Sequence, residues 1–485
     1  MGKKYSFESY PDADSAVDRI CEIYDKMAGR VRERFQRFLD GERAGSPVKD
    51  ACYPELRVSV AHDALVYDSR PSWGTLPYPG RYATTLTQPA LFRDYYQAQL
   101  KRLADYHGVP FEVGLSNRPI PLSFVVDEAT AELRPGDLQA LQAVFALPDL
   151  AAIDDGIANG TCRLSPGQAR PLSLFSAERV DLAIQRLHHY TGTHARYFQG
   201  FVLFTNYQRY IDAFIAHGRA LIADRGGEDG YQSFVEPGDV VMEVGGGTEK
   251  VDIGRPFQQM PAYHLTRPDR LGITMVNIGV GPSNAKTITD HLAVLRPHCW
   301  LMIGHCGGLR RSQQLGDYVL AHAYERADHV LDHDLPVSVP VPPIAEIQVA
   351  LQDAVSGVTG LTGENLKSRM RTGTVVTTDD RNWELRFNDL YSRFNRSRAI
   401  AIDMESATIA ANGFRLRVPY GTLLCVSDKP LHGEIKLRGM ANSFYRQRID
   451  QHLTIGLEAI RILRDRGVNQ LHSRKLRAFD EPPFQ

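Results

Sequence analysis

The sequence predicts an α/β protein in two parts: a smaller N-terminal α/β or α+β domain over residues 1–170 and a larger domain over residues 171–485. Three observations support this prediction. The length of 485 residues suits two or three domains of about 150 residues each. Residues 154–171, DDGIANGTCRLSPGQARP, have the composition of a linker loop. After them, apolar strand-like runs alternate with helical patterns, which is typical of a mostly parallel or mixed sheet flanked by helices.

The N-terminal domain begins with a helix that we predict over residues 13–42. Its apolar residues, from Val17 and Ile20 to Phe38, recur at helical spacing, and Asp and Ser residues precede them as candidate caps. Three short apolar runs then predict strands, and one longer stretch predicts a helix: the strands are LRVSVAH (56–62), FEVGL (111–115) and LSFVV (122–126), and the helix is LFRDYYQAQLKRLADYHG (91–108).

The larger domain contains apolar strands that end in polar residues. In sheets of this kind ligands bind beyond the carboxyl ends of the strands, so we expect the functional site there. The predicted strands are GITMVNIGVG (272–281), CWLMIGHCGG (299–308), RTGTVVTTD (371–379), RAIAIDM (398–404) and YGTLLCVSD (420–428), and the first is followed by a helix, SNAKTITDHLAVL (283–295).

The composition is that of a soluble globular protein, with 43% hydrophobic and 23% charged residues. The net charge of −1 gives no general attraction to nucleic acid or to an anionic membrane, and we expect neither as a partner. Six cysteines are scattered singly, which favours a reducing compartment over a disulfide framework or a zinc ribbon. The N-terminus lacks the apolar core of a signal peptide, and no apolar run approaches membrane length. We therefore expect a cytoplasmic protein.

Charged residues at the ends of two predicted strands are the strongest candidates for catalysis. In AIAIDMESATIA (399–410), Asp403, Met404 and Glu405 lie between a buried strand and a buried helix, and Asp428 ends a later strand. Glu405 or Asp428 alone could simply cap the following helix. Together they suit a different arrangement, in which one carboxylate accepts hydrogen bonds from a diol and a carboxylic acid of raised pKa protonates a leaving group.

Two further motifs each allow two interpretations. Gly279-Val-Gly281-Pro-Ser-Asn284 is not a dinucleotide fingerprint, because Asn284 replaces the third glycine and the next strand does not end in an acid. It is either a tight turn or a helix N-terminus that forms one wall of a pocket. Arg310-Arg311, after the glycine turn, is either a solvated basic pair or a clamp for phosphate. The histidine clusters lack metal-site spacing, and we expect no metal.

Four segments in this order resemble the nucleoside phosphorylase and nucleosidase superfamily: GVGPSNAKTITDHL, IGHCGGLRRSQQLGDYVLA, AIDMESATIAA and LCVSDKP. The resemblance covers residues 201–463. RLHHYTGTHARYFQGFVLFTNYQRYIDAF (186–214), the long preceding domain and the overall length are similar to the bacterial AMP nucleosidases within that superfamily.

The resemblance implies hydrolysis of the N-glycosidic bond of AMP, giving adenine and ribose 5-phosphate through an oxocarbenium-like transition state. It implies that Glu405 holds the ribose hydroxyls, that Met404 packs against the sugar and that Asp428 protonates the purine at N7. The turn containing His305, Gly307 and Gly308 would line the sugar side. General acid assistance of this kind is typically worth about 10²–10⁴-fold in rate.

Two roles stay open within the resemblance. A related nucleosidase of methylthioadenosine has glutamates in the turn that corresponds to Thr205–Tyr210, and these supply its water-activating acid. Here the turn has no carboxylate, and we expect Asn206 and Tyr207 in it to contact substrate. Trp383 or Arg381 could stack on the purine, although Trp383 suits a core position equally well.

The 5′-phosphate requires cations, and the candidates are Arg310, Arg311, Lys286 and Lys429, with Arg255 or Arg267 of a neighbouring subunit. The resemblance implies a homo-oligomer, a trimer or hexamer. It also implies activation by MgATP and inhibition by phosphate through the N-terminal domain, whereas the chemistry needs no cofactor beyond AMP and water.

Two alternatives differ from this reading in testable ways. A purine nucleoside phosphorylase on the same fold would use phosphate as its nucleophile. A non-catalytic nucleotide-sensing module would keep the pocket without turnover, but it would have no need of an acid at position 428.

Overall fold

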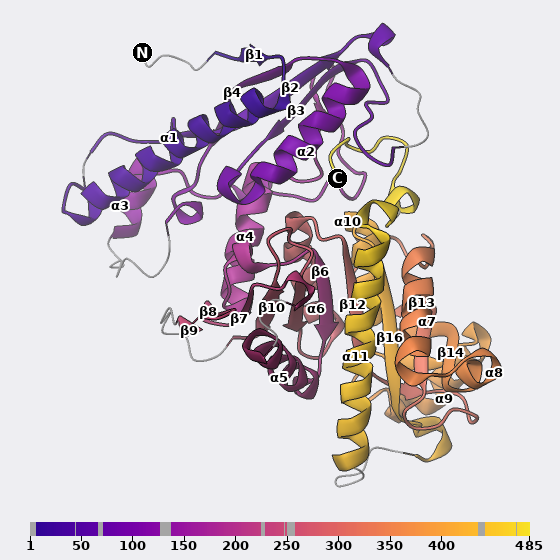
Figure 1. Cartoon of the computed structure of the whole chain (residues 1–485). Coiled ribbons are helices and arrows are strands. Elements are labelled where there is room, and N and C mark those ends of the chain that lie inside the picture. Colours follow the sequence, from indigo (N-terminus) through magenta and orange to yellow (C-terminus); the bar gives the residue numbers. More distant parts are fainter. Residues whose placement is uncertain are drawn as a thin grey trace. The chain divides into compact units, whose positions relative to one another are not determined.

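The computed structural model describes residues 6–43, 45–65, 71–126, 137–224, 228–246, 248–249, 258–434, 442–471 and 473–485, and the chain divides into two compact units (Figure 1). The first unit comprises the chain up to Gln185 together with Ala478–Gln485, and the second comprises Arg186–Arg477. The division therefore lies later than the boundary at 170/171 that the sequence suggests, and the predicted linker belongs to the first unit.

The first unit contains a five-stranded sheet, three complete α-helices and the first part of a fourth within its described residues. The predicted first helix is confirmed as α1 (Ala13–Leu39), which ends slightly earlier than expected and begins where Asp12 accepts a hydrogen bond from the Ser15 amide at 2.8 Å. The sheet has the order β1-β4-β2-β3-β5, from β1 (Glu8–Tyr10), β4 (Phe111–Pro119), β2 (Cys52–Val60), β3 (Gly80–Thr85) and β5 (Arg170–Pro171); the other two helices are α2 (Pro89–His107) and α3 (Asp137–Val144).

One predicted strand of this unit is wrong. Within LSFVV (122–126), Leu122–Phe124 form a 3₁₀ turn, and the Phe124 amide donates to the Pro121 carbonyl. Pro119 and Pro121 lack the amide hydrogen that a strand interior needs, so β4 ends at Pro119 and the chain turns.

The second unit contains an eleven-stranded mixed sheet in its described residues. Strands β6, β11, β12 and β16 are parallel, whereas β13, β14 and β15 run antiparallel to β12 and β16. The order is β15 (Ala401–Asp403), β14 (Met370–Thr378), β13 (Tyr318–Ala327), β16 (Tyr420–Asp428), β12 (Cys299–Gly308), β6 (Phe201–Thr205), β11 (Ile273–Asn277), β10 (Ala262–Thr266), β7 (Ser233–Glu236), β8 (Val240–Glu243) and β9 (Thr248–Glu249).

An additional pairing closes part of this sheet into a ring. Gly307 and Gly308 of β12 pair with Ile402 and Ala401 of β15, so that the strands from β15 to β12 form a small closed barrel. The predicted strands over 299–308 and 420–428 are confirmed over the same residues, as β12 and β16.

Helices cover the sheet (Figure 1). The helices of this unit are α5 (Gln208–Asp224), α6 (Pro282–Leu292), α7 (Ala345–Thr359), α8 (Gly363–Arg369), α9 (Phe387–Ser397), α10 (Ser406–Leu416) and α11 (Asn442–Arg466), and α4 (Ala177–Thr191) spans the division between the units. Helix α10 packs against β13, β14, β16 and α6, and α11 packs against α5, α7 and β12. Within the described residues, none of the helices combines the length and the apolar character that crossing a membrane requires.

Candidate active site

Several of the candidate residues lie where the parallel strands end. Thr205 of β6 pairs with Asn277 of β11, and Gly307 of β12 pairs with Asp428 of β16. The residues that follow β6 and β11 are therefore neighbours, as are the ends of β12 and β16. This is the edge at which an α/β sheet binds its ligand.

Glu405 connects the segments that follow two of these strands. Its Oε2 accepts a hydrogen bond from Asn206 Nδ2 at 2.9 Å, and its Oε1 accepts one from the Gly281 amide at 2.7 Å. Only 1% of the residue is exposed. Gly281 caps α6 with φ of 116°, a backbone conformation that favours glycine. The glycine motif is thus a helix N-terminus that holds a carboxylate of the protein itself.

Asp403 fixes the backbone that carries Glu405. Its Oδ1 accepts from Thr377 Oγ1 at 2.6 Å, and its Oδ2 accepts from the Ser406 amide at 2.9 Å and from the Ser406 hydroxyl. No role is predicted for Asp403 from the sequence, although an aspartate just before a helix commonly accepts a hydrogen bond from the amide two or three residues on, a capping signal that could have identified it.

Asp403 and Glu405 are both buried, between the end of β15 and the start of α10. Burial raises the pKa of Glu405, the charge of Asp403 raises it further, and the hydrogen bond from Gly281 opposes the rise. Burial also raises the pKa of Asp403, against the opposing hydrogen bonds from Ser406 and Thr377. Because nearby like charges disfavour each other, the pair resists carrying two negative charges at once.

Asp428 is half-buried at the end of β16, and Ser427 Oγ donates a hydrogen bond to its Oδ1 at 2.6 Å. The buried Cys306 thiol lies near both Asp403 and Asp428. Burial raises the pKa of Cys306, and the charges of these two acids raise it further. Strands β15 and β16 therefore bring Asp403 and Asp428 near the same buried thiol, and Glu405 lies two residues beyond Asp403.

The glycine turn lies where β12 meets two other strands. A Cβ atom on Gly308 would lie 2.9 Å from Val426 Cγ1 of β16 and 3.2 Å from Lys429 Cγ, so β12 and β16 can pack this closely here because residue 308 is a glycine. The His305 ring contacts the Tyr207 ring at a centroid distance of 4.7 Å. This contact joins the β6–α5 turn to β12, as expected if both segments form one site.

Asn206 presents an acceptor beside Glu405. Because its Nδ2 donates to the carboxylate, the orientation of the amide is determined, and its Oδ1 faces elsewhere. Within the described residues this Oδ1 is buried and has no hydrogen-bond partner. A buried acceptor without a partner is uncommon, and a hydroxyl group or water of the reaction would satisfy it.

Arg310 and Arg311 line a cavity of about 170 Å³ beyond the glycine turn. Within the described residues neither side chain forms an ion pair. The other residues that line the cavity are Leu309, Tyr391, Phe394, Asn395, Ala399, Leu431 and His432.

The other cations proposed for phosphate have acidic partners. Lys429 Nζ lies 2.6 Å from Glu434 Oε1, Lys286 Nζ lies 2.6 Å from Asp290 Oδ2, and Arg267 pairs with Asp269 at 3.2 Å. Arg255 lies outside the described residues.

Trp383 occupies a core position, which is one of the two roles that the sequence allows. Only 7% of it is exposed, and it packs with Leu309, Val376 and Ile402 and edge-on against Phe394 at 5.6 Å. Arg381 is exposed, and Met404, between the two acids, is half-buried.

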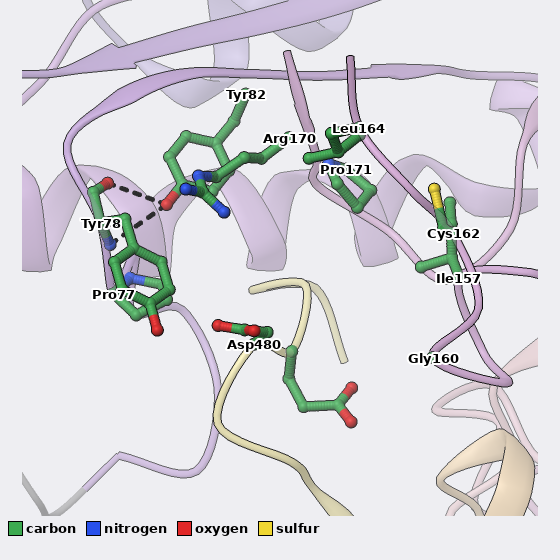
Figure 2. A pocket seen from close by; sticks show the side chains of 11 residues that line it. Pro77, Tyr78, Tyr82, Ile157, Gly160, Cys162, Leu164, Arg170, Pro171 and Asp480 are labelled. Atoms are coloured by element: carbon green, nitrogen blue, oxygen red, sulfur yellow. Dashed lines mark hydrogen bonds between the residues drawn. The ribbon is translucent and has the colours of Figure 1, made fainter. Parts of the chain in front are cut away.

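A second cavity, of about 270 Å³, lies within the first unit (Figure 2). The Arg170 guanidinium stacks over the Tyr78 ring at 4.6 Å, and Tyr82 Oη donates to the Tyr78 carbonyl at 2.8 Å. Asp480 and Glu481, from the C-terminal segment, contribute carboxylates.

Two family models match the chain. One, described as the bacterial AMP nucleoside phosphorylase N-terminus, matches residues 15–169, and the phosphorylase superfamily matches residues 252–451. Among solved structures, AMP nucleosidase from Bacteroides thetaiotaomicron VPI-5482 is 27% identical, with a TM-score of 0.43 over 59% of this chain and 98% of that chain. Purine nucleoside phosphorylase from Toxoplasma gondii is 18% identical, with a TM-score of 0.41 over 57% and 98%.

Full-length relatives share far more of the sequence. The AMP nucleosidase of Escherichia coli strain K12 is 50% identical over 475 residues, which are 97% of this chain and 98% of that protein. The AMP nucleosidase of Escherichia coli O157:H7 matches to the same extent. This identity of one residue in two extends over both units, and the chain belongs to the AMP nucleosidase family.

Proposed function

We propose that this chain hydrolyses the N-glycosidic bond of AMP and releases adenine and ribose 5-phosphate. The observation that carries the proposal is the position of Glu405, whose carboxylate is held by Asn206 and Gly281 at the ends of two strands, in a family named for this reaction. A carboxylate held by two donors still has lone pairs for the two hydroxyls of a ribose.

The reaction breaks the bond between C1′ and N9. The bonding electron pair passes to adenine, and Asp428 gives its proton to N7, so that the base leaves without a negative charge. Water attacks C1′, and the proton that the water loses restores the acid form of Asp428. Hydrogen bonds from Asn206, from Gly281 and from the two ribose hydroxyls favour the ionised form of Glu405 and oppose the effect of burial. In this form Glu405 stabilises the positive charge that develops on the sugar.

We propose that the free carbonyl oxygen of Asn206 accepts a hydrogen bond from a ribose hydroxyl or from the attacking water. Its burial beside Glu405 supports this role. A developing oxocarbenium ion needs only a weak nucleophile, so a water held by an amide oxygen suffices where the turn has no carboxylate. Tyr207 and His305 would form the wall of the same site, and Met404 would pack against the sugar.

We propose that Arg310 and Arg311 hold the 5′-phosphate. They follow the glycine turn directly, line a cavity and form no ion pair in the described part of the chain, whereas Lys429 and Lys286 already have acidic partners. Hydrogen bonds from guanidinium to an anion contribute about 1.5–3 kcal/mol each. Arg310→Ala should therefore raise the KM for AMP by roughly 10-fold or more, and exposed Arg396→Ala on α9 should leave it unchanged.

The proposed chemistry is tested with Asp428→Asn. The variant should bind AMP with nearly unchanged affinity by calorimetry, but it should release adenine at least about 10²-fold more slowly, because the proton donor is missing. The control is Asp465→Asn, an exposed acid on α11, which should keep full turnover. Full turnover by Asp428→Asn would refute the assigned acid.

The substrate is tested by adenine release from AMP and from adenosine, each with and without phosphate. We expect release from AMP that does not require phosphate. Release from adenosine only when phosphate is supplied would instead identify a phosphorylase.

The family resemblance also supports a cytoplasmic homo-oligomer, such as a hexamer, whose chemistry needs no metal or cofactor. MgATP would activate it and phosphate would inhibit it. Sedimentation velocity tests the assembly, and initial rates at varied MgATP and phosphate test the regulation; rates independent of both would contradict it.

A further inference from the structure

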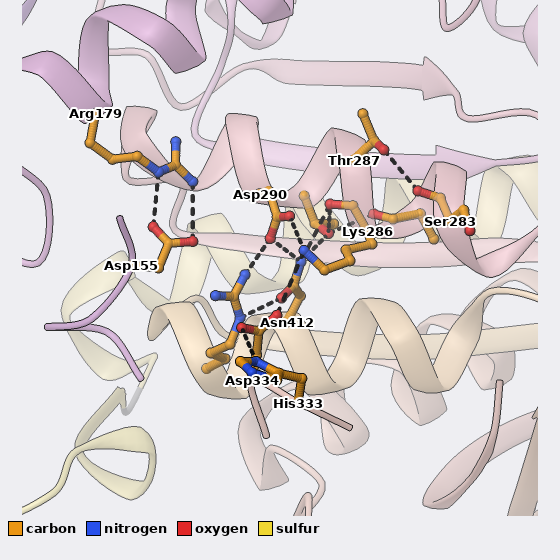
Figure 3. Close-up of polar contacts among 12 residues, drawn as sticks. Asp155, Arg179, Ser283, Lys286, Thr287, Asp290, His333, Asp334 and Asn412 are labelled. Carbon is orange, nitrogen blue, oxygen red and sulfur yellow. Dashed lines mark hydrogen bonds and ion pairs between the residues drawn. The ribbon is translucent and has the colours of Figure 1, made fainter. Parts of the chain in front are cut away.

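Helices α6 and α10 contact each other at two places: at their N-terminal caps and, farther along, through polar side chains. Gly281, the cap of α6, donates its amide to Glu405, and Glu405 is itself the cap of α10. Farther along, the two helices share a buried polar network (Figure 3). We call this network the α6–α10 clamp; its residues are Lys286, Thr289, Asp290, Asn412 and Arg415.

Asn412 is the centre of the clamp and is fully buried. Its Nδ2 donates to Thr289 Oγ1 and to Asp290 Oδ1, both at 2.8 Å, and its Oδ1 accepts from Arg415 Nε at 2.8 Å. The amide is thus used at both ends, with acceptors on α6 and a donor on its own helix. Few side chains other than asparagine present donors and an acceptor at this spacing.

Asp290 is the acidic member of the clamp and contacts both of its basic side chains. Its Oδ1 also accepts from the Arg415 guanidinium, which is 3% exposed, and its Oδ2 accepts from Lys286 Nζ at 2.6 Å. A buried network in which donors and acceptors are matched fixes one arrangement of its helices, because any slip leaves polar groups unpaired in a dry environment.

Asn412 lies away from the carboxylate that would meet the substrate. Asn412 lies seven residues beyond Glu405 on one helix, or about 10 Å at 1.5 Å per residue. It can affect catalysis only through the position of α10 relative to α6. That relative position sets the hydrogen bond between the Gly281 amide and Glu405, because the two partners sit at the starts of the two helices.

We propose that Asn412 and Asp290 are positioning residues of the reaction: the α6–α10 clamp holds Glu405 against the Gly281 amide. The inference rests on the proposed function only for its kinetic readout. With the clamp broken, α10 can shift, and a displacement of roughly 1 Å at a catalytic group can reduce the rate about 10²-fold.

The test is Asn412→Ala, with Val355→Ala as the matched control. Val355 is a buried residue of α7 whose loss should lower the melting temperature without disturbing α6 or α10. Asn412→Ala should lower kcat for AMP by 10-fold or more, whereas Val355→Ala should keep kcat near the wild-type value. Because the Gly281 amide favours the ionised carboxylate, its loss should move the acidic limb of the kcat–pH profile to higher pH.

A second readout does not depend on turnover. The Gly281 amide should exchange its hydrogen with solvent faster in Asn412→Ala than in the wild type or in Val355→Ala, as measured by hydrogen–deuterium exchange of the 278–283 segment. If Asn412→Ala does not fold, Thr289→Val removes a single acceptor with little change of shape and should show the same shifts at smaller size.

The outcomes separate the two proposals. If the wild-type protein did not hydrolyse AMP, the proposed function would be refuted. The exchange measurement would still test whether the clamp holds Glu405 against the Gly281 amide. Wild-type turnover together with an Asn412→Ala variant that loses only thermal stability, with unchanged kcat, pH profile and Gly281 exchange, would refute the clamp.

Discussion

Buried acids outside the candidate active site make stability depend on pH, and Asp181 is the clearest case. It is 2% exposed in the first unit and accepts hydrogen bonds from Tyr53 Oη at 2.6 Å, from Thr87 Oγ1 at 2.8 Å and from Gln88 Nε2 at 3.2 Å. Burial nevertheless raises the pKa of Asp181 to about 7, and these donors only oppose the rise. The folded protein therefore binds a proton here that the unfolded chain releases near its ordinary value of 3.8.

The sign of the effect follows from this difference. The contribution of protonated Asp181 to stability is complete below the unfolded pKa and is lost as the pH rises through about 7. Denaturant unfolding of the wild type should thus show a free energy that decreases between about pH 4 and pH 7, by about 1.4 kcal/mol for each unit of pKa difference. Asp181→Asn should flatten this part of the curve, and an unchanged slope would refute the assignment.

At the residue scale, the positions of the candidate acids were easier to predict from the sequence than the surroundings of the candidate cations. Glu405 and Asp428 follow apolar strands, so their position at the strand ends is visible in the local pattern. The partners of Lys286 and Lys429 are less visible. Asp290, at the i+4 position on the same helix, could have been anticipated, whereas Glu434 meets Lys429 across a turn. Proximity in sequence to the motif turns is thus a weak predictor of a free cation.

At the scale of the elements, the close packing of β12 against β16 depends on a glycine. Gly308 lies where a Cβ atom would approach Val426 Cγ1 to 2.9 Å. Gly308→Ala should force the strands apart and destabilise the second unit by about 1–3 kcal/mol, as overpacking of a core does. Because the strain falls at the glycine turn, turnover should fall as well.

The matched control for this change is Gly357→Ala. Gly357 is exposed on α7, where an added Cβ would meet nothing within 4 Å. There the same substitution should stabilise by about 0.5–1 kcal/mol, since alanine favours a helix. Thermal melts of the two variants check the pair; equal melting temperatures would show that the strand ring accommodates a methyl group.

Individual strands of the second unit were predictable, but the ring was not. Periodicity placed β12 and β16 over the residues where they occur, because each is a continuous apolar run between polar ends. The pairing of Gly307 with Ile402 joins residues that are far apart in sequence, and the antiparallel direction of β13 to β15 depends on such pairings. Local patterns carry no information on these contacts. Trp383 illustrates the same limit, since its core neighbours come from β14 and β15 as well as its own segment.

At the scale of the whole molecule, the chain passes between its units twice. Helix α4 makes the first passage, and the segment Ala478–Gln485 returns to complete the first unit. Phe484 is 2% exposed in that unit, its amide donates to the Leu172 carbonyl at 3.0 Å, and its ring meets Tyr95 edge-on at 6.4 Å. The segment Ala478–Gln485 is therefore part of the fold of the first unit.

Phe484 should consequently stabilise the first unit without affecting the chemistry of the second. Phe484→Ala leaves a cavity beside Tyr95 and should cost about 3–5 kcal/mol of stability. Phe479→Ala is the matched control, because Phe479 is 91% exposed in the same segment and should contribute almost nothing. Hydrogen exchange should accelerate in α2 and at the Leu172 amide, which follows β5, for Phe484→Ala alone, while basal release of adenine stays near the wild-type rate. Equal exchange in the two variants would show that the Phe484 side chain does not stabilise the first unit.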